Sequence, residues 1–166
     1  MKNTTLCYIK EGHNYLMLHR TKKENDQSQG KWLGIGGKFE ESESPDECLL
    51  REVYEETGLS LTSYRLRGIV TFVSDIYETE YMFLYTADGY RGSLHREADG
   101  SLTPVINGVN IPCPEGVLKW IDIDAVPFLE LWEGDRIFLA LLTSEEDFFT
   151  LKLIYEGDRL ISHEIN

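Results

Sequence analysis

Three glutamates stand close together at positions 52, 55 and 56. If this segment is helical, their i, i+3 and i+4 spacing places the three carboxylates on one face, where like charges repel one another. A hard divalent cation, which prefers oxygen ligands, would relieve that repulsion. Glu52, Glu55 and Glu56 are therefore candidates for a metal site, although a run of charges by itself is more typical of a merely solvated acidic face.

The segment 45–57 is predicted to be the helix that carries these glutamates. Ser44 is a favourable N-cap, Glu47 completes a capping box with it, and Pro45 suits the first helical position. Gly58 gives a C-terminal stop. Because successive side chains turn by about 100° around a helix, five residues are expected on the apolar side: Leu49, Leu50, Val53, Tyr54 and Thr57.

The composition limits the kinds of protein that this chain can be. Its 166 residues, 42% hydrophobic and 27% charged, fit one soluble domain with its own core. A net charge of −13 argues against nonspecific binding to nucleic acid or to anionic membranes. Three widely spaced cysteines favour a reducing compartment, and no signal peptide or membrane-spanning stretch is visible. We therefore expect a cytoplasmic protein.

Short β-prone segments make up most of the remaining chain. They predict a hairpin of 4–9 with 15–19, a hairpin of 148–155 with 160–165, single strands at 32–37, 66–74, 77–87 and 117–121, and a second helix at 135–143. Turn residues dominate 88–114, which is predicted to be a hairpin insertion within a single domain spanning 1–166. Two helices among at least seven strands favour an α+β fold, with a mixed sheet and helices on its faces.

The glutamates belong to a longer pattern of fixed spacing. Gly37 is followed after five residues by Glu43, and after seven more by Arg51-Glu52-Val53-Tyr54-Glu55-Glu56-Thr57-Gly58-Leu59. This pattern resembles the signature of the Nudix hydrolases, with every fixed position filled. The resemblance implies the Nudix α/β/α sandwich, and it favours a metal site over a solvated acidic face.

The same resemblance implies how the site works. Nudix enzymes use this loop and helix to bind magnesium and to position a water against the phosphorus of a nucleoside diphosphate linked to another group. Magnesium is therefore the expected cofactor, with manganese as a possible substitute. The implied metal ligands are Gly36, through its carbonyl, Glu52, Glu55, Glu56 and Glu115, the last at a position where the family often has a further acid. Glu52, Glu55 and Glu56 are also the implied catalytic carboxylates.

Basic residues near the signature are the next candidates. Arg51 counts among the expected catalytic residues; pairing with Glu43 to fix the loop against the helix is the favoured role, and direct contact with phosphate is the alternative. Lys38, just after the glycine turn, is a candidate phosphate contact. Lys23 lies in a polar loop whose cations could draw phosphates towards the site.

Further segments resemble MutT-like enzymes that hydrolyse oxidised purine nucleoside triphosphates such as 8-oxo-dGTP. Trp132 and Asp135 resemble the tryptophan and acid that bind the purine in the mammalian enzyme. Two departures concern the base: Leu33 replaces a base-contacting asparagine, and Gly134 replaces the first of two aspartates. The alternatives are that Trp132 is a core residue and that Asp135 is a helix N-cap.

Together these features predict a magnesium-dependent enzyme that cleaves a nucleoside triphosphate into nucleoside monophosphate and pyrophosphate. The leading substrate is an oxidised purine such as 8-oxo-dGTP. The expected partner is a small nucleotide, with no direct contact to nucleic acid or membrane, and the protein is expected as a monomer or homodimer. The alternatives are a Nudix enzyme for ADP-ribose, a nucleotide sugar or a dinucleoside polyphosphate, and a nucleotide-binding module without catalysis.

Overall fold

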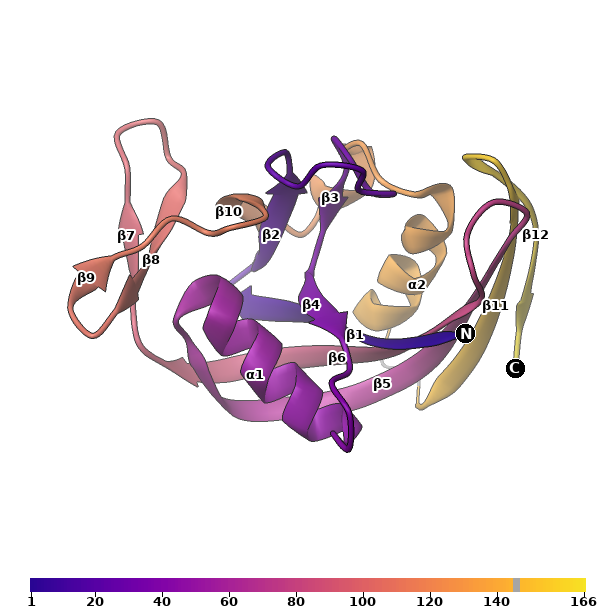
Figure 1. Cartoon of the computed structure of the whole chain (residues 1–166), viewed down its shortest axis with the longest axis horizontal. Coiled ribbons are helices and arrows are strands. Elements are labelled where there is room, and N and C mark those ends of the chain that lie inside the picture. Colours follow the sequence, from indigo (N-terminus) through magenta and orange to yellow (C-terminus); the bar gives the residue numbers. More distant parts are fainter. Residues whose placement is uncertain (145–146) are drawn as a thin grey trace.

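A computed structural model describes residues 1–144 and 147–166, and it shows a mixed β-sheet with a helix packed on each face (Figure 1). The strands are β1 (Lys2–Glu11), β2 (Asn14–Arg20), β3 (Trp32–Leu33), β4 (Ile35–Lys38), β5 (Ser60–Ser74), β6 (Glu80–Arg91), β7 (Leu94–Arg96), β8 (Leu102–Ile106), β9 (Val109–Asn110), β10 (Gly116–Asp122), β11 (Phe149–Glu156) and β12 (Arg159–Ile165). The helices are α1 (Pro45–Thr57), α2 (Glu133–Thr143) and a 3₁₀ turn at Val126–Phe128.

The strand order of the described sheet is β12-β11-β5-β6-β1-β2-β10-β8-β7, with β3 beside β2, β4 beside β1 and β9 beside β8. β1 pairs in parallel with β6 and antiparallel with β4. β11 pairs in parallel with β5, whereas β5 and β6 are antiparallel. The sheet is therefore mixed, as the sequence predicts.

Alternating side chains on the central strand supply two separate cores. On β1, Leu6 and Tyr8 join the core under α2, which includes Phe138, whereas Cys7 and Ile9 join the core under α1. Successive residues of a strand point to opposite faces of the sheet, so this alternation is the expected one. The two cores confirm the predicted α/β/α sandwich. Among the described residues, no helix is long and apolar enough to cross a membrane.

Helix α1 has the predicted ends but a different buried side. Ser44 accepts a hydrogen bond from the Glu47 backbone, the capping box is complete, and Gly58 ends the helix with a positive φ of 72°. The buried residues are Cys48, Leu49, Val53, Glu56 and Thr57. Leu50 and Tyr54 are 36% and 42% exposed, so their predicted burial is wrong. The helix packs on β1 and β4 with a side rotated towards the glutamates, which places Glu56 in the interior.

Several element boundaries also differ from the sequence prediction. The strand predicted at 32–37 is divided into β3 and β4, and the strand predicted at 77–87 is β6, which runs from Glu80 to Arg91. β5 begins at Ser60 rather than at residue 66, because β5 and β6 form a long antiparallel pair in which irregularities accommodate residues 61–68. Helix α2 begins at Glu133, with Trp132 as its N-cap, two residues before the predicted start. The alternative that Asp135 is the N-cap is therefore wrong.

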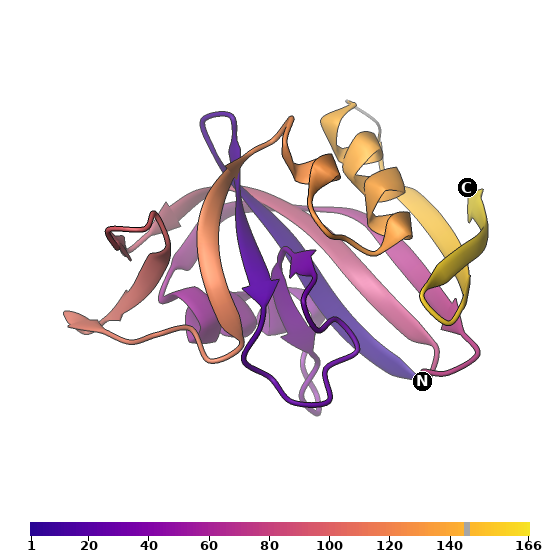
Figure 2. The ribbon, with the colours of Figure 1, turned by 90° about the horizontal axis from the view of Figure 1, so that it is seen from above.

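The predicted hairpins within 88–114 are present after the end of β6. β7 pairs with β8, and β8 with β9, and the turns between them contain Gly100 and the pair Asn107-Gly108 at positive φ. Leu102 of β8 is buried and pairs with Leu118 of β10, which attaches the hairpins to the sheet. Figure 2 shows them at the end of the molecule opposite to β12.

Candidate active site

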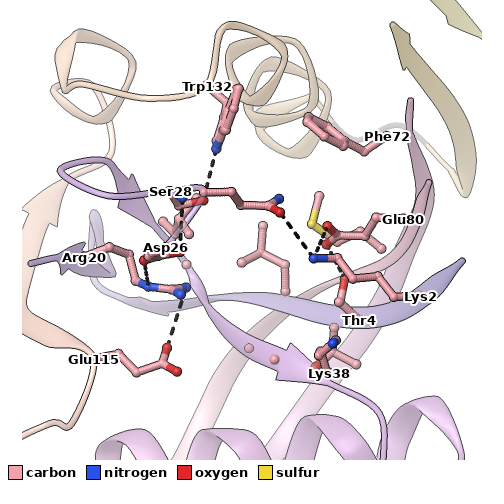
Figure 3. Close-up of a pocket in the computed structure, with 18 of the residues that line it drawn as sticks. Lys2, Thr4, Arg20, Asp26, Ser28, Lys38, Phe72, Glu80, Glu115 and Trp132 are labelled. Carbon is pink, nitrogen blue, oxygen red and sulfur yellow. Dashed lines mark hydrogen bonds and ion pairs between the residues drawn. The ribbon is translucent and has the colours of Figure 1, made fainter. Parts of the chain in front are cut away.

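A pocket of about 430 Å³ lies where β1, β4 and β6 meet α2 and the loop at 21–31 (Figure 3). Eight predicted site residues line it: Lys23, Leu33, Gly36, Lys38, Glu52, Glu115, Trp132 and Asp135. Arg51, Glu55 and Glu56 are not among its described lining residues. We call the part around Glu52 and Glu115 the acidic end, and the part around Phe72, Trp132 and Asp135 the aromatic end.

Glu56 is the most confined carboxylate of the acidic end. Glu56 is only 3% exposed, and neither of its carboxylate oxygens has a hydrogen-bond partner in the described structure. Burial, followed by the neighbouring Glu115, raises the pKa of Glu56 well above its usual range. Burial likewise raises the pKa of Glu52, against the opposing effect of Arg51. An unpaired buried carboxylate is costly, so this arrangement fits residues that share a cation.

Arg51 is not among the described lining residues, but it lies at the centre of a group of acidic side chains that includes Glu52. Its Nε lies 2.6 Å from Glu43 Oε2, and its Nη1 lies 2.8 Å from Glu52 Oε1 and 3.1 Å from Glu55 Oε2. Nη2 donates to the Lys38 carbonyl oxygen at 2.9 Å. The Arg51 hydrogen bond holds the pKa of Glu43 at about 2. The expected pair with Glu43 therefore forms, and it anchors the loop that precedes α1.

Glu55 differs from its two neighbours in the triplet. Its side chain is 54% exposed and binds Arg51, whereas the Glu52 side chain is only 15% exposed. The three glutamates thus occupy three environments: buried and unpartnered for Glu56, partly buried and paired for Glu52, and largely solvated for Glu55. Glu115 lies on a different part of the chain, yet it is close enough to Glu56 to help raise the pKa of that carboxyl.

Two glycines let β4 pass close to its neighbours at the acidic end. A Cβ atom at Gly36 would overlap the Thr5 carbonyl oxygen of β1, and one at Gly37 would overlap the Glu52 carboxylate. A side chain at Gly36 would therefore force β4 away from β1, whereas one at Gly37 would displace the Glu52 carboxylate. Gly36 and Gly37 lie within β4, so the glycine turn predicted before Lys38 is wrong. The Gly36 backbone lines the pocket, where its carbonyl is a candidate ligand.

A chain of polar contacts joins the two ends of the pocket (Figure 3). Glu115 lies 3.6 Å from Arg20, whose Nε is 2.9 Å from Asp26. The Ser28 backbone donates to Asp26 at 3.1 Å, and the Trp132 indole N–H donates to the Ser28 hydroxyl at 3.0 Å. The loop at 21–31 is thereby attached to both ends. Lys23 remains 55% exposed, with its ammonium 3.8 Å from Glu115.

Trp132 is both a core residue and a wall of the pocket, so its two interpretations are not exclusive. It is 5% exposed and meets the rings of Phe72 and Tyr155 edge to face, at centroid distances of 5.5 and 5.1 Å. The Lys31 ammonium lies 4.5 Å from the Trp132 ring centroid. One side of the indole therefore already carries a cation–π contact.

Asp135 presents an unpartnered carboxyl at the aromatic end. The residue is 5% exposed, and its Oδ2 atom has no hydrogen-bond partner in the described structure. Burial, and then the charge of Glu80, raise its pKa to about 8. At neutral pH the group is therefore mainly a neutral acid, which can both donate and accept a hydrogen bond.

Gly134 leaves no room for a second acid beside Asp135. A Cβ atom there would lie 2.5 Å from a Leu153 methyl carbon and 2.8 Å from the Tyr155 hydroxyl. The Gly134 backbone N–H donates to that hydroxyl at 2.6 Å. Close packing of α2 against β11 thus explains the glycine at this position.

Several lining residues escaped the sequence analysis. Lys2 and Thr4 of β1 and Glu80 and Met82 of β6 line the aromatic end. They meet because β1 and β6 pair in parallel, with Lys2 opposite Glu80 and Thr4 opposite Met82. Strand alternation would place Lys2 and Thr4 on one face with Leu6, but the pairing with β6 comes from tertiary structure alone.

One compact trio of possible metal ligands among the described residues lies elsewhere: His13, Asp122 and Asp124, all exposed, have ligand atoms within 4.8 Å of one another. The acidic end has the better donor set for a hard cation, because it combines the unpartnered oxygens of Glu56 with Glu52, Glu115 and a nearby backbone carbonyl. A divalent cation bound there would neutralise phosphate charge and lower the pKa of a water.

Comparison with known proteins agrees with this geometry. The NUDIX domain family model matches residues 2–142. The chain is 28% identical to an oxidized purine nucleoside triphosphate hydrolase from Danio rerio. The alignment spans 146 residues and covers 87% of this chain and 83% of that protein. It is 26% identical over 145 residues to the Mus musculus protein of the same name, covering 86% and 82%.

Among solved structures, the mutator MutT protein from Bacillus halodurans superposes with a TM-score of 0.81 at 24% identity, covering 100% of this chain and 98% of that chain. This likeness shows that the two proteins share a fold. Together with the match of the family model over most of the chain, it identifies the protein as a member of the Nudix hydrolase family.

Proposed function

We propose that this Nudix hydrolase cleaves oxidised purine nucleoside triphosphates, such as 8-oxo-dGTP, into nucleoside monophosphate and pyrophosphate. The observation that carries the proposal is the single pocket with two unlike ends. Carboxylates suited to a divalent cation line one end, while Trp132 and the unpartnered Asp135 line the other. A ligand that is polyanionic at one end and aromatic at the other matches this division. The names of the Danio rerio and Mus musculus relatives support the same substrate class.

At the acidic end, we assign metal binding to Glu52, Glu56, Glu115 and the Gly36 carbonyl, with magnesium as the cation and manganese as its substitute. The cation supplies Lewis-acid stabilisation of phosphate charge and activation of a water. Glu55 takes an outer place in the same set, since it is largely exposed and bound to Arg51. Arg51 acts by holding Glu43, Glu52 and the loop in position.

The remaining predicted residues bind the nucleotide. Lys38 and Lys23 line the pocket near the acidic end and are proposed to contact phosphate oxygens. At the aromatic end, Asp135 is proposed to hydrogen-bond the purine edge, and Trp132 and Leu33 to provide apolar contact with the base. The Lys31 ammonium over Trp132 adds positive charge beside this subsite.

A second candidate is hydrolysis of another nucleoside diphosphate derivative, such as ADP-ribose, a nucleotide sugar or a dinucleoside polyphosphate. Leu33 and Gly134 keep this candidate open, because they depart from the base-contacting pattern that the resemblance to the mammalian oxidised-purine enzyme implies. A nucleotide-binding module without catalysis is less compatible with an intact set of glutamates.

A substrate panel tests the proposal. With magnesium present, kcat/KM is measured for 8-oxo-dGTP, dGTP, ADP-ribose and diadenosine polyphosphates. We expect 8-oxo-dGTP to be preferred over dGTP by at least about tenfold, as a few hydrogen bonds to the altered edge would give. Preference for ADP-ribose or for a dinucleoside polyphosphate would favour the second candidate. Binding without turnover of any substrate would favour the module.

A further inference from the structure

A second carboxyl group, besides that of Asp135, lines the aromatic end of the pocket. Glu80 of β6 lines the pocket, and its side chain is 13% exposed. The Thr4 hydroxyl donates to Glu80 Oε2 at 2.7 Å, and the Lys2 ammonium lies 3.5 Å from Oε1. Figure 3 shows Glu80, Lys2 and Thr4 together on the side of the pocket away from Glu115. Glu80 is thus held in place from both sides.

Glu80 has few polar competitors in this part of the pocket. The neighbouring lining is partly apolar, with Leu6, Leu33, Phe72, Met82 and Leu153. Among the polar lining residues, Gln27 accepts a hydrogen bond from the Lys2 ammonium at 3.4 Å through its Oε1. In such a pocket a small number of placed polar groups decides which ligand edge is accepted. Helix α2 offers only Asp135, since the Gly134 position is filled by Leu153 and Tyr155. The second acid of the aromatic end therefore comes from β6.

We propose that Glu80, held by Lys2 and Thr4, is a specificity-determining residue that selects guanine-type over adenine-type nucleotides. A carboxylate only accepts hydrogen bonds, and its two oxygens have about four lone-pair sites, of which Thr4 and Lys2 use two. A guanine-type edge presents a ring N–H beside an exocyclic amine, so two donors meet the acceptor. An adenine-type edge presents one amine beside an unprotonated ring nitrogen, whose lone pair the carboxylate repels.

The inference rests on the proposed function in one respect, namely that the aromatic end receives the nucleobase. It is therefore tested by binding rather than by turnover. Calorimetry without divalent cation measures the dissociation constants of dGMP and dAMP for the wild-type protein and for Glu80→Gln, because both ring nitrogens beside the adenine amine are unprotonated in dAMP. Glutamine has the same size as glutamate, but its amide replaces one acceptor oxygen with an NH2 donor. One of the two donors on the guanine edge would then face another donor.

We expect wild-type protein to prefer dGMP over dAMP, and Glu80→Gln to lose about 10- to 100-fold of that preference, the range for a hydrogen bond to a charged group. The matched control is Glu78→Gln. Glu78 is two residues away, its side chain is 52% exposed and pairs with the N-terminal amine, and it does not line the pocket. The control is expected to keep the wild-type preference.

Three outcomes overturn the inference: no preference in wild-type protein, an unchanged preference in Glu80→Gln, or an equal loss in Glu78→Gln. Thermal unfolding verifies that each variant is folded. If Glu80→Gln does not fold, Glu80→Asp takes its place, because a shortened carboxylate should also lose the preference. If wild-type protein hydrolyses no triphosphate but its binding preference depends on Glu80, the inference holds and the proposed reaction fails.

Discussion

The acidic and aromatic ends of the pocket are built in different ways. The acidic end comes mainly from one continuous segment, residues 36–56, to which Glu115 is added. The aromatic end draws a few residues from each of seven separate places: Lys2, Thr4 and Leu6 from β1, Ser28 from the loop, Leu33 from β3, Phe72 from β5, Glu80 and Met82 from β6, Trp132 and Asp135 at the start of α2, and Leu153 from β11. The first is a local motif, whereas the second exists only after the sheet has formed.

The two ends also manage buried charge differently. At the acidic end, Arg51 binds Glu43, Glu52 and Glu55, and only Glu56 is left buried without a partner. At the aromatic end, Asp135 avoids the cost of a buried charge by remaining protonated, with a pKa of about 8. Burial raises the pKa of Glu56 as well, so a bound cation would be needed to keep that carboxylate charged, whereas Asp135 is accommodated as a neutral acid. We therefore expect substitutions at the two ends to change different properties of the protein.

The largest expected effect comes from Glu56→Gln at the acidic end. Loss of a buried metal-binding carboxylate should lower magnesium-dependent kcat by about 10³-fold or more, since metal stabilisation of the transition state is worth several kcal/mol. Unfolding by denaturant should show that stability is within about 1 kcal/mol of wild type, because no protein hydrogen bond is lost.

Glu55→Gln is the matched control for this change. Glu55 belongs to the same helix and the same triplet, but it is largely exposed. We expect a loss of kcat at least about tenfold smaller than that of Glu56→Gln. Equal losses would contradict the distinction between the two environments. Retention of near wild-type kcat by Glu56→Gln would remove Glu56 from the metal site.

The next effect concerns Asp135 and pH. The folded-state pKa of about 8 lies above the ordinary value of 3.8, so folded protein binds more protons than unfolded protein between these pH values. The stability that Asp135 contributes is complete below about pH 4 and is lost as pH rises through 8. Glu80 adds to the raised pKa, whereas Arg136 and Lys31 oppose it.

Asp135→Asn should remove this dependence. The free energy of unfolding of wild type, relative to the variant, is expected to fall by up to about 1.4 kcal/mol per pH unit between pH 5 and 8. Denaturant unfolding at a series of pH values measures the difference. Asp88→Asn, at an exposed position on β6, is the control and should follow wild type. A parallel course for wild type and Asp135→Asn would contradict a protonated Asp135.

The smallest effect is expected from Arg51→Lys. A lysine keeps the positive charge but cannot contact Glu43 through two nitrogens and also reach Glu52 and the Lys38 carbonyl. The Arg51 guanidinium is partly exposed, so we expect its replacement to lower the free energy of unfolding by about 1–2 kcal/mol. Discrimination between 8-oxo-dGTP and dGTP should not change. A change in discrimination without a loss of stability would show that Arg51 acts on the nucleotide.

Local sequence patterns predicted the helix ends well, because capping is a matter of neighbouring residues. Ser44, Glu47 and Gly58 play the predicted parts in α1. The buried side of that helix was predicted less well, as Leu50 and Tyr54 are exposed while Glu56 is buried. Hydrophobicity alone places a glutamate outside, and only the position of β4 and β1 against the helix reverses this. Similarly, the start of α2 depends on how Gly134 packs against β11.

By itself, the sequence determined the family and the identity of the acidic end, because the glycine, arginine and glutamate positions have a fixed spacing along one segment. It also determined the alternation that gives the sheet two cores. Tertiary structure alone decided which carboxylates are buried, and it brought Glu115 to Glu56 and Glu80 to Asp135. The physical reason is that desolvation and the register of parallel strands depend on distant parts of the chain, and no local pattern encodes them.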